Sequence, residues 1–254
     1  MNKLLQAIDL SVAPLSPPKE GGLARAIQQM LVPSVAYQDR RVEAYGRTVP
    51  HDDLGGDLVD LVATGRDVIA YVADVSGHDL PACVLMGMLK AAMHYGLTFG
   101  QPLPALLGDI NRLLPSLKEP NMYATLAGLR FDESNEVEYI TAGHVPLLHY
   151  RLRQGDVVRC SMDQFPLGLF EQAGYMSSRV PFEPGDLFAL VSDGVVETDD
   201  AEEEEFGLER LEYILCDYAG RPLPEIFDAA LAAVTRHGTP EDDQTLLLVR
   251  ALKG

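Results

Sequence analysis

The chain has few cysteines, few basic residues and no long apolar run, and each shortage excludes a class of protein. Its three cysteines, Cys83, Cys160 and Cys216, lie far apart and form no CxxC pair, so neither a disulfide framework nor a zinc knuckle is indicated. We therefore expect a reducing, cytoplasmic compartment. No uninterrupted apolar run reaches the roughly 18 residues of a membrane-spanning helix. Residues 1–14 lack the charge and the apolar length of a secretory signal.

Basic residues are outnumbered by acidic ones. Lys and Arg total 20 against 38 Asp and Glu, which gives a formal net charge of −18 at pH 7. Such a field repels nucleic-acid phosphates and anionic lipid headgroups, so we expect neither nucleic acid nor a membrane as partner. Hydrophobic residues make up 47% of the chain, which is enough for a sizeable core and excludes wholesale disorder.

The sequence predicts an N-terminal segment and one main domain. Residues 1–36 form a helical and linker segment, in which the Pro- and Gly-rich stretch 14–22 separates a short helix from a second helix over residues 23–31. Apolar residues recur at helical spacing in that second helix. Its apolar stripe packs either on the main domain or on a regulator or second copy. The main domain spans residues 37–254.

The main domain alternates between blocks of short strands and pairs of helices. This pattern does not fit the regular βαβ repeat of a parallel sheet, so it favours an antiparallel α+β architecture. About ten strands are too many for one sheet, and two sheets packed face to face with helix pairs outside would bury every apolar face. The expected strands lie at 41–49, 57–64, 67–75, 122–131, 136–144, 146–152, 156–160, 186–193 and 244–252, and the expected helices at 80–97, 103–114, 207–218 and 224–237.

Aspartates stand at the ends of four predicted strands. They are Asp57, Asp74, Asp193 and the pair Asp242-Asp243. One Asp beside Gly is usually a turn residue, but four in comparable positions indicate carboxylates that converge on one rim. Converging carboxylates raise one another's pKa unless a cation neutralises them. All-oxygen ligation suits Mg²⁺ or Mn²⁺, and paired ions activate water for attack on phosphorus, so the chemistry indicated is phosphoester hydrolysis.

Eight sequence blocks, in order, resemble the SpoIIE/RsbU-type serine phosphatases, the bacterial branch of the metal-dependent PPM/PP2C protein phosphatases. The resemblance covers about residues 23–250, and the order of the blocks makes it specific. The blocks are GGDLVD (55–60), VADVSGHD (72–79), the Leu/Met/Ala-rich helix after it, LGDINRLL (107–114), TAGHVPLL (141–148), PLGLF (166–170), PGDLFALVSDGVVET (184–198) followed by FGLERL, and EDDQTLLLVR (241–250).

This resemblance implies an αββα sandwich that binds two Mn²⁺ or Mg²⁺ ions. It implies hydrolysis of phosphoserine or phosphothreonine by a metal-bound water. Carried over by position, Asp57 bridges both ions, and Asp74 binds one of them with the backbone carbonyl of Val75. Asp193 and Asp242 bind the other ion.

Further residues near these ligands are candidates for the same site. Gly55, Gly56 and Gly194 let the backbone come close to the ions, where a Cβ atom would obstruct. Gly194 and Asp243 are additional candidate site residues. Asp79 stands where the family usually has glycine, and it either recruits a further ion or caps the following helix.

Other polar residues have more than one interpretation. His78 is a candidate general acid toward the leaving serine oxygen, or it fixes the turn between strand and helix. We expect His144 to secure a β-turn and Asn111 to bond to a loop backbone near the site. Asp60 is expected to support the ligands or to lie at a strand edge.

Two rival functions are weighed against the phosphatase. The dipeptides His51-Asp52 and His78-Asp79 would suit an HD-type phosphohydrolase, but that class presents these ligands on helices, whereas both dipeptides here fall in Gly-rich loops. A catalytically weak, phosphatase-like binding module in partner-switching signalling would be expected to lack a metal aspartate, and none is missing.

The resemblance also indicates partners. We expect the substrate to be a phosphorylated regulatory protein, most simply an anti-sigma-factor antagonist of the STAS type. Residues 23–31 and the helix pair 80–114 are the expected surfaces for a regulator or for self-association. The helix pair follows the strand of Asp74 directly, so its movement could displace Asp74 or Val75.

Overall fold

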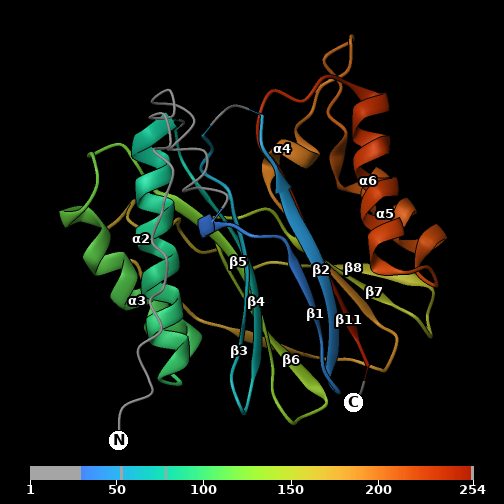
Figure 1. The fold of residues 1–254 in the computed structure, drawn as a ribbon, viewed down its shortest axis with the longest axis horizontal. Coiled ribbons are helices and arrows are strands. Elements are labelled where there is room, and N and C mark those ends of the chain that lie inside the picture. Colours follow the sequence, from blue (N-terminus) through green and yellow to red (C-terminus); the bar gives the residue numbers. More distant parts are fainter. Residues whose placement is uncertain (1–29, 52–53, 78, 253–254) are drawn as a thin grey trace, which may run out of the picture.

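A computed structural model describes residues 30–51, 54–77 and 79–252. Two antiparallel sheets pack face to face, and helices cover the outer face of each (Figure 1). The predicted α+β sandwich with αββα layers is therefore confirmed. The segment 1–29, with most of the helix expected over residues 23–31, lies outside the described residues.

The first sheet has the C-terminal strand near its centre. Its order is β1-β2-β11-β10-β7-β8, and each neighbouring pair is antiparallel. Because β11 lies between β2 and β10, residues from both ends of the domain become neighbours. The strands are β1 (Val35–Gln38), β2 (Val42–Val49), β7 (Leu147–Arg151), β8 (Asp156–Cys160), β10 (Leu187–Val191) and β11 (Gln244–Ala251).

The second sheet contains two hairpins, β3-β4 and β5-β6, and β9 pairs with β6 at its edge. Its order is β3-β4-β5-β6-β9, again antiparallel throughout. In β4, Ile69 and Tyr71 pack toward the helices, whereas Ala70 and Val72 pack toward the other sheet. Both faces are buried, which is why its sequence is a continuous apolar run. The strands are β3 (Leu58–Ala63), β4 (Val68–Val75), β5 (Ala124–Phe131), β6 (Glu136–Ala142) and β9 (Ser178–Pro181).

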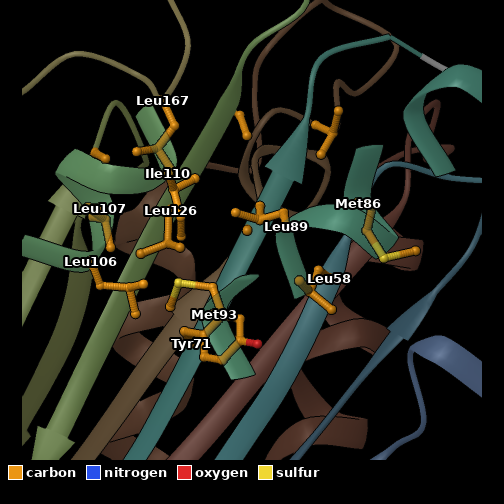
Figure 2. Packing of buried hydrophobic residues seen from close by; sticks show 14 of the residues in the cluster. Leu58, Tyr71, Met86, Leu89, Met93, Leu106, Leu107, Ile110, Leu126 and Leu167 are labelled. Carbon is orange, nitrogen blue, oxygen red and sulfur yellow. The ribbon is translucent and has the colours of Figure 1, made fainter. Parts of the chain in front are cut away.

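A helix pair covers each sheet. Helices α2 (Asp79–Thr98) and α3 (Leu103–Leu113) cover the second sheet, and α5 (Gly207–Tyr218) and α6 (Leu223–His237) cover the first. Figure 2 shows Met93 of α2 beside Tyr71 of β4, and Leu89 of the same helix in the same apolar cluster. By length and hydropathy alone, α2 could also cross a membrane; this is weak evidence, because its apolar residues at helical spacing form part of this core.

Four short elements were not expected from the sequence. They are β1, β9, a four-residue helix α4 (Asp193–Val196) and a 3-10 turn η1 (Leu114–Ser116). Each has three or four residues, which is too short for a periodic pattern. Strand β1 crosses the boundary placed at residues 36/37, and the division into two segments stays a prediction.

Candidate active site

Strand polarity brings the four predicted aspartates to one rim of the sandwich. In the second sheet, Leu58 pairs with Ala73, so Asp57 before β3 faces Asp74 near the end of β4. In the first sheet, Val191 at the end of β10 pairs with Leu246 of β11. Asp193 follows that end of β10 as the first residue of α4, and Asp242 lies two residues before β11. The side chains act on one another's pKa, which places the four carboxylates close together.

Asp57 is the most deeply buried of the four. Its side chain accepts a hydrogen bond of 2.5 Å from the Thr245 hydroxyl of β11, which links the two sheets. Burial raises the pKa of the Asp57 carboxyl well above its usual range, and the charges of Asp74 and Asp243 raise it further. Neutral Asp57 is therefore favoured as long as no positive charge lies beside it.

The carboxyl pKa values of Asp74 and Asp193 are also raised. Burial raises the pKa of Asp74 to about 7, and the carboxylates of Asp193, Asp242 and Asp243 contribute. Burial and Asp242 also raise the pKa of Asp193, although the Gly194 N–H donates a 2.9 Å hydrogen bond to its carboxylate. The carboxyl groups at the rim therefore cannot all ionise at neutral pH unless a positive charge lies beside them, so the site favours binding of a cation.

Asp243 is built into the site more firmly than its role as an additional candidate implied. Its carboxyl is buried at 4% exposure and accepts a 2.9 Å hydrogen bond from the His51 backbone N–H. Its backbone carbonyl accepts a 3.3 Å bond from the Ser192 hydroxyl, and Ser192 in turn accepts a 3.0 Å bond from the Thr245 N–H. Ser192 and Thr245 were not predicted as site residues, and their signal is a hydroxyl residue close to the Asp193 and Asp242-Asp243 motifs.

Three glycines leave space that the site occupies. A Cβ at Gly55 would lie 1.5 Å from Oδ2 of Asp243. At Gly56 it would lie 2.4 Å from the Val75 carbonyl oxygen, and at Gly194 2.2 Å from the Asp243 carbonyl oxygen. No side chain can occupy these positions, so the backbone approaches the carboxylates and the Val75 carbonyl directly.

This set of donors fits a hard divalent cation. It consists of carboxylates and a backbone carbonyl, the oxygen ligands that Mg²⁺ and Mn²⁺ take. Within the described ranges, no three His, Cys, Asp or Glu side chains are already drawn together tightly enough to enclose an ion.

An acidic cavity of about 1030 Å³ opens beside Asp193 and Asp242. Burial and nearby carboxylates, Asp193 first among them, raise the pKa of Glu197 in its wall. The cavity therefore extends the negative potential of the rim outward toward solvent. The other acidic residues in the wall are Asp199, Asp200, Glu203, Glu205 and Glu241.

The remaining predicted residues have different outcomes. His78 lies outside the described residues, so its role as general acid stays a prediction, and Asp79 is described only as the first residue of α2. His51 approaches the site through its backbone N–H, which does not match the HD-type alternative. His144 contacts the Thr125 hydroxyl at 2.7 Å.

Asn111 bonds to a loop backbone, as predicted. Its Nδ2 donates to the carbonyls of Phe170 and Glu171, at 3.0 and 3.2 Å. Its Oδ1 accepts from the Gly168 N–H at 2.7 Å and from the Tyr175 hydroxyl at 3.1 Å. The buried amide therefore holds the loop 166–175 on helix α3.

Asp60 bonds to helix α2. Its Oδ2 lies 2.8 Å from the Tyr71 hydroxyl, 3.0 Å from Lys90 Nζ and 2.5 Å from His94 Nε2. Lys90 and His94 belong to α2, and Asp60 and Tyr71 belong to β3 and β4. One buried carboxylate therefore fixes the helix on the strand pair that leads to Asp57 and Asp74.

Comparisons with known proteins agree with this geometry. The family model of stage II sporulation protein E (SpoIIE) matches residues 64–252. Phosphoserine phosphatase RsbU of Bacillus subtilis is 26% identical over 232 residues, which are 90% of this chain and 69% of RsbU. The SiaA-PP2C domain of Pseudomonas aeruginosa has a TM-score of 0.79 at 22% identity, over 91% of this chain and 95% of that domain. The catalytic domain of the phosphatase PstP, solved with two manganese ions, has a TM-score of 0.64 at 15% identity, over 84% and 99% of the chains.

The raised pKa of Asp74 predicts how the metal-free protein responds to pH. Because the pKa is 3.8 in the unfolded chain and about 7 in the fold, ionised Asp74 destabilises the fold, fully above pH 7 and not at all below about pH 4. Asp74→Asn should therefore raise the melting temperature in EDTA at pH 8, on the order of 5–10 °C. This gain should vanish as the pH falls through that window to 4.

Scanning fluorimetry from pH 4 to pH 8 measures this effect. Asp217→Asn, at an exposed position of α5, is the control and should leave the melting temperature unchanged at every pH. A gain for Asp74→Asn that is as large at pH 4 as at pH 8 would contradict the explanation.

Proposed function

The chain belongs to the SpoIIE family of PPM-type serine/threonine phosphatases, and we propose that it hydrolyses phosphoserine or phosphothreonine on a regulatory protein with two divalent cations at the acidic rim. The observation that carries this proposal is the convergence of Asp57, Asp74, Asp193 and Asp242 on one rim, where the carboxyl pKa values of Asp57, Asp74 and Asp193 are raised. RsbU, the relative named above, is a phosphoserine phosphatase, which supports the same substrate class.

Each aspartate would have a separate role in holding the cations. Asp57 would bridge the two ions, with its carboxylate oriented by the Thr245 hydroxyl. Asp74 and the Val75 carbonyl would hold one ion, and Asp193 and Asp242 the other. PstP, a structural neighbour, was solved with two manganese ions, which supports two ions here. When bound, such ions supply positive charge for the phosphate and make a water nucleophilic at neutral pH.

The residues of the chain then prepare the site for a single phosphate group. Cation binding favours the ionised form of Asp57 and Asp74, so protons leave these carboxyls as the ions enter. The glycines at 55, 56 and 194 let the backbone pack directly against Asp243 and the Val75 carbonyl. His78 is the proposed general acid for the leaving serine oxygen.

Activity should require Mn²⁺ or Mg²⁺. We expect slow hydrolysis of an aryl phosphate with Mn²⁺ and no hydrolysis after EDTA. Asp→Asn at position 57, 74, 193 or 242 should weaken Mn²⁺ activation about 100-fold or more, because each change removes a ligand charge. Activity is measured as initial rate against Mn²⁺ concentration.

The neighbouring Asp243 provides the internal comparison. Asp243→Asn keeps an oxygen for the His51 N–H and should cost less than Asp242→Asn. Equal rates with and without chelator would exclude the two-metal mechanism. A larger loss at Asp243 would show that the ligand assignment at this motif is wrong by one residue.

We further propose that the helix pair α2 and α3 regulates the metal centre. Asp60 ties α2 to β3 and β4, the strands that lead to Asp57 and Asp74. The opposite face of α2 exposes apolar side chains to solvent, which suits a regulator or a second copy. These side chains are Leu80, Val84, Met88 and Tyr95.

Substitutions on this exposed face should change regulation and leave the fold intact. Met88→Gln and Tyr95→Gln should change the rate or the Mn²⁺ requirement about threefold or more, because the helix moves against β4, and should shift the melting temperature by less than about 2 °C. Tyr213→Gln, on the exposed face of α5, is the control and should change neither. Unchanged kinetics in every α2 variant would reject the regulatory role.

The proposed substrate is a folded phosphoprotein of the STAS type. A chain with a net charge of −18 does not attract acidic polymers, and the cations would supply the charge for one phosphate. Specificity must therefore come from docking of a protein surface beside the rim. Binding energy from such remote contacts accelerates the reaction only when the whole partner is present.

Phosphorylated STAS proteins from the same genome should react at least about tenfold faster than phosphopeptides cut from them. Unrelated phosphoproteins are the third arm of the comparison, and phosphate release is the measurement. Equal rates for all three would reject recognition of a folded partner but would keep the phosphatase. Absence of turnover with Mn²⁺ on every substrate would favour the binding-module alternative.

A further inference from the structure

His144 lies where the chain crosses from one sheet to the other at the rim. Strand β6 of the second sheet ends at Ala142, and β7 of the first sheet begins at Leu147. Gly143 adopts φ 61°, and a Cβ there would lie 2.3 Å from the Pro166 ring. The crossover therefore has one shape, which fixes where His144 is placed.

The imidazole of His144 faces a residue from each sheet. Its Nδ1 lies 2.7 Å from the hydroxyl oxygen of Thr125 in β5. The backbone of Val191, two residues before Asp193, interacts with the same ring. Burial lowers the pKa of His144 to about 4, so the ring is neutral at physiological pH and carries one N–H.

The tautomer with that N–H on Nε2 directs it away from Thr125. Nε2 is buried with no partner at hydrogen-bond distance among the described residues, while the Val191 backbone favours a proton on the ring. A proton on Nε2 leaves Nδ1 with a lone pair. The Thr125 hydroxyl is then the donor and Nδ1 the acceptor in the 2.7 Å contact.

Thr125 is the direct cross-strand partner of Asp74. The two residues pair in the β4–β5 register, so their side chains lie on one face with Cβ atoms about 5 Å apart. A hydroxyl has a single proton to donate. Released from His144, it would turn to the ionised carboxylate of Asp74, since charged acceptors form the stronger hydrogen bond.

We infer that His144 is a positioning residue for the metal centre, which accepts a hydrogen bond from the Thr125 hydroxyl and so keeps that hydroxyl from donating to the carboxylate of Asp74. A hydrogen bond at Asp74 would have to break before a cation could bind there. His144 thus keeps Asp74 available as a ligand. The inference rests on the proposed function only in taking Asp74 as a cation ligand.

The test is a double-mutant cycle read by Mn²⁺ binding in isothermal titration calorimetry on the full chain. His144→Phe keeps a planar ring without an acceptor and should weaken Mn²⁺ binding about tenfold. Thr125→Val removes the hydroxyl at constant shape and should change the affinity less than about threefold. The double variant should return to within about threefold of the wild type, because no hydroxyl proton remains to occupy Asp74.

Rescue separates this role from a merely structural one. If His144 acted through packing, adding Thr125→Val would not restore affinity, so a double variant as weak as His144→Phe overturns the inference. Wild-type affinity in His144→Phe also overturns it. If His144→Phe does not fold, His144→Leu, a second side chain without an acceptor, takes its place in the cycle.

A second buried histidine provides the matched control. His149 Nε2 lies 2.9 Å from Asp186 Oδ2, and Asp186 precedes β10, at the end of that strand away from Asp193. His149→Phe should lower the melting temperature and leave Mn²⁺ affinity unchanged. A wild-type chain that binds Mn²⁺ but hydrolyses no phosphoprotein would overturn the proposed function alone. A wild-type chain that binds no Mn²⁺ would overturn both.

Discussion

Carboxylates from both sheets meet at the rim where β4 and β10 end and where β3 and β11 begin. Their mutual repulsion opposes the packing of the two sheets at this rim and must be offset by hydrogen bonds or a cation. Burial removes the water that would screen them, so the pKa of Asp74 rises to about 7 and that of Asp57 rises well above its usual range. The Thr245 hydroxyl and the N–H groups of His51 and Gly194 hold carboxylate oxygens in place. The absence of side chains at Gly55 and Gly56 lets the backbone pack directly against Asp243 and the Val75 carbonyl.

The helices outside the sheets are connected to this rim through polar side chains in apolar layers. Asp60 joins α2 to β3 and β4 by a buried carboxylate with two cationic or polar partners on the helix. Such a bond is directional, whereas the packing of Leu89 and Met93 around it is not (Figure 2). The helix is therefore fixed in one rotation about its own axis, because any other rotation would leave the buried Asp60 carboxylate without its donors on α2.

Most of the architecture was predictable because long strands and helices carry a pattern. The continuous apolar run of β4 and the helical spacing of α2 placed both elements within one or two residues of their observed bounds. The four-residue strand β9 is an edge strand with alternating exposure and a terminal proline, so it carried no such signal. The convergence of the aspartates followed from strand ends, but the contacts of Thr245 with Asp57 and of His144 with Thr125 depend on how two sheets face each other. That arrangement is a property of packing, and no local pattern in the sequence encodes it.

The Asn111 amide has consequences for how this chain can vary over evolutionary time. Its two donors and two acceptor sites are all engaged by Phe170, Glu171, Gly168 and Tyr175, which is the full capacity of an amide side chain. Aspartate would lose both donors and leucine all four bonds, so no single replacement preserves the set. Helix α3 and the loop 166–175 are therefore constrained to vary together, because a change in one would break bonds to the other. Variation in the loop should be confined to residues whose side chains leave those backbone groups where they are.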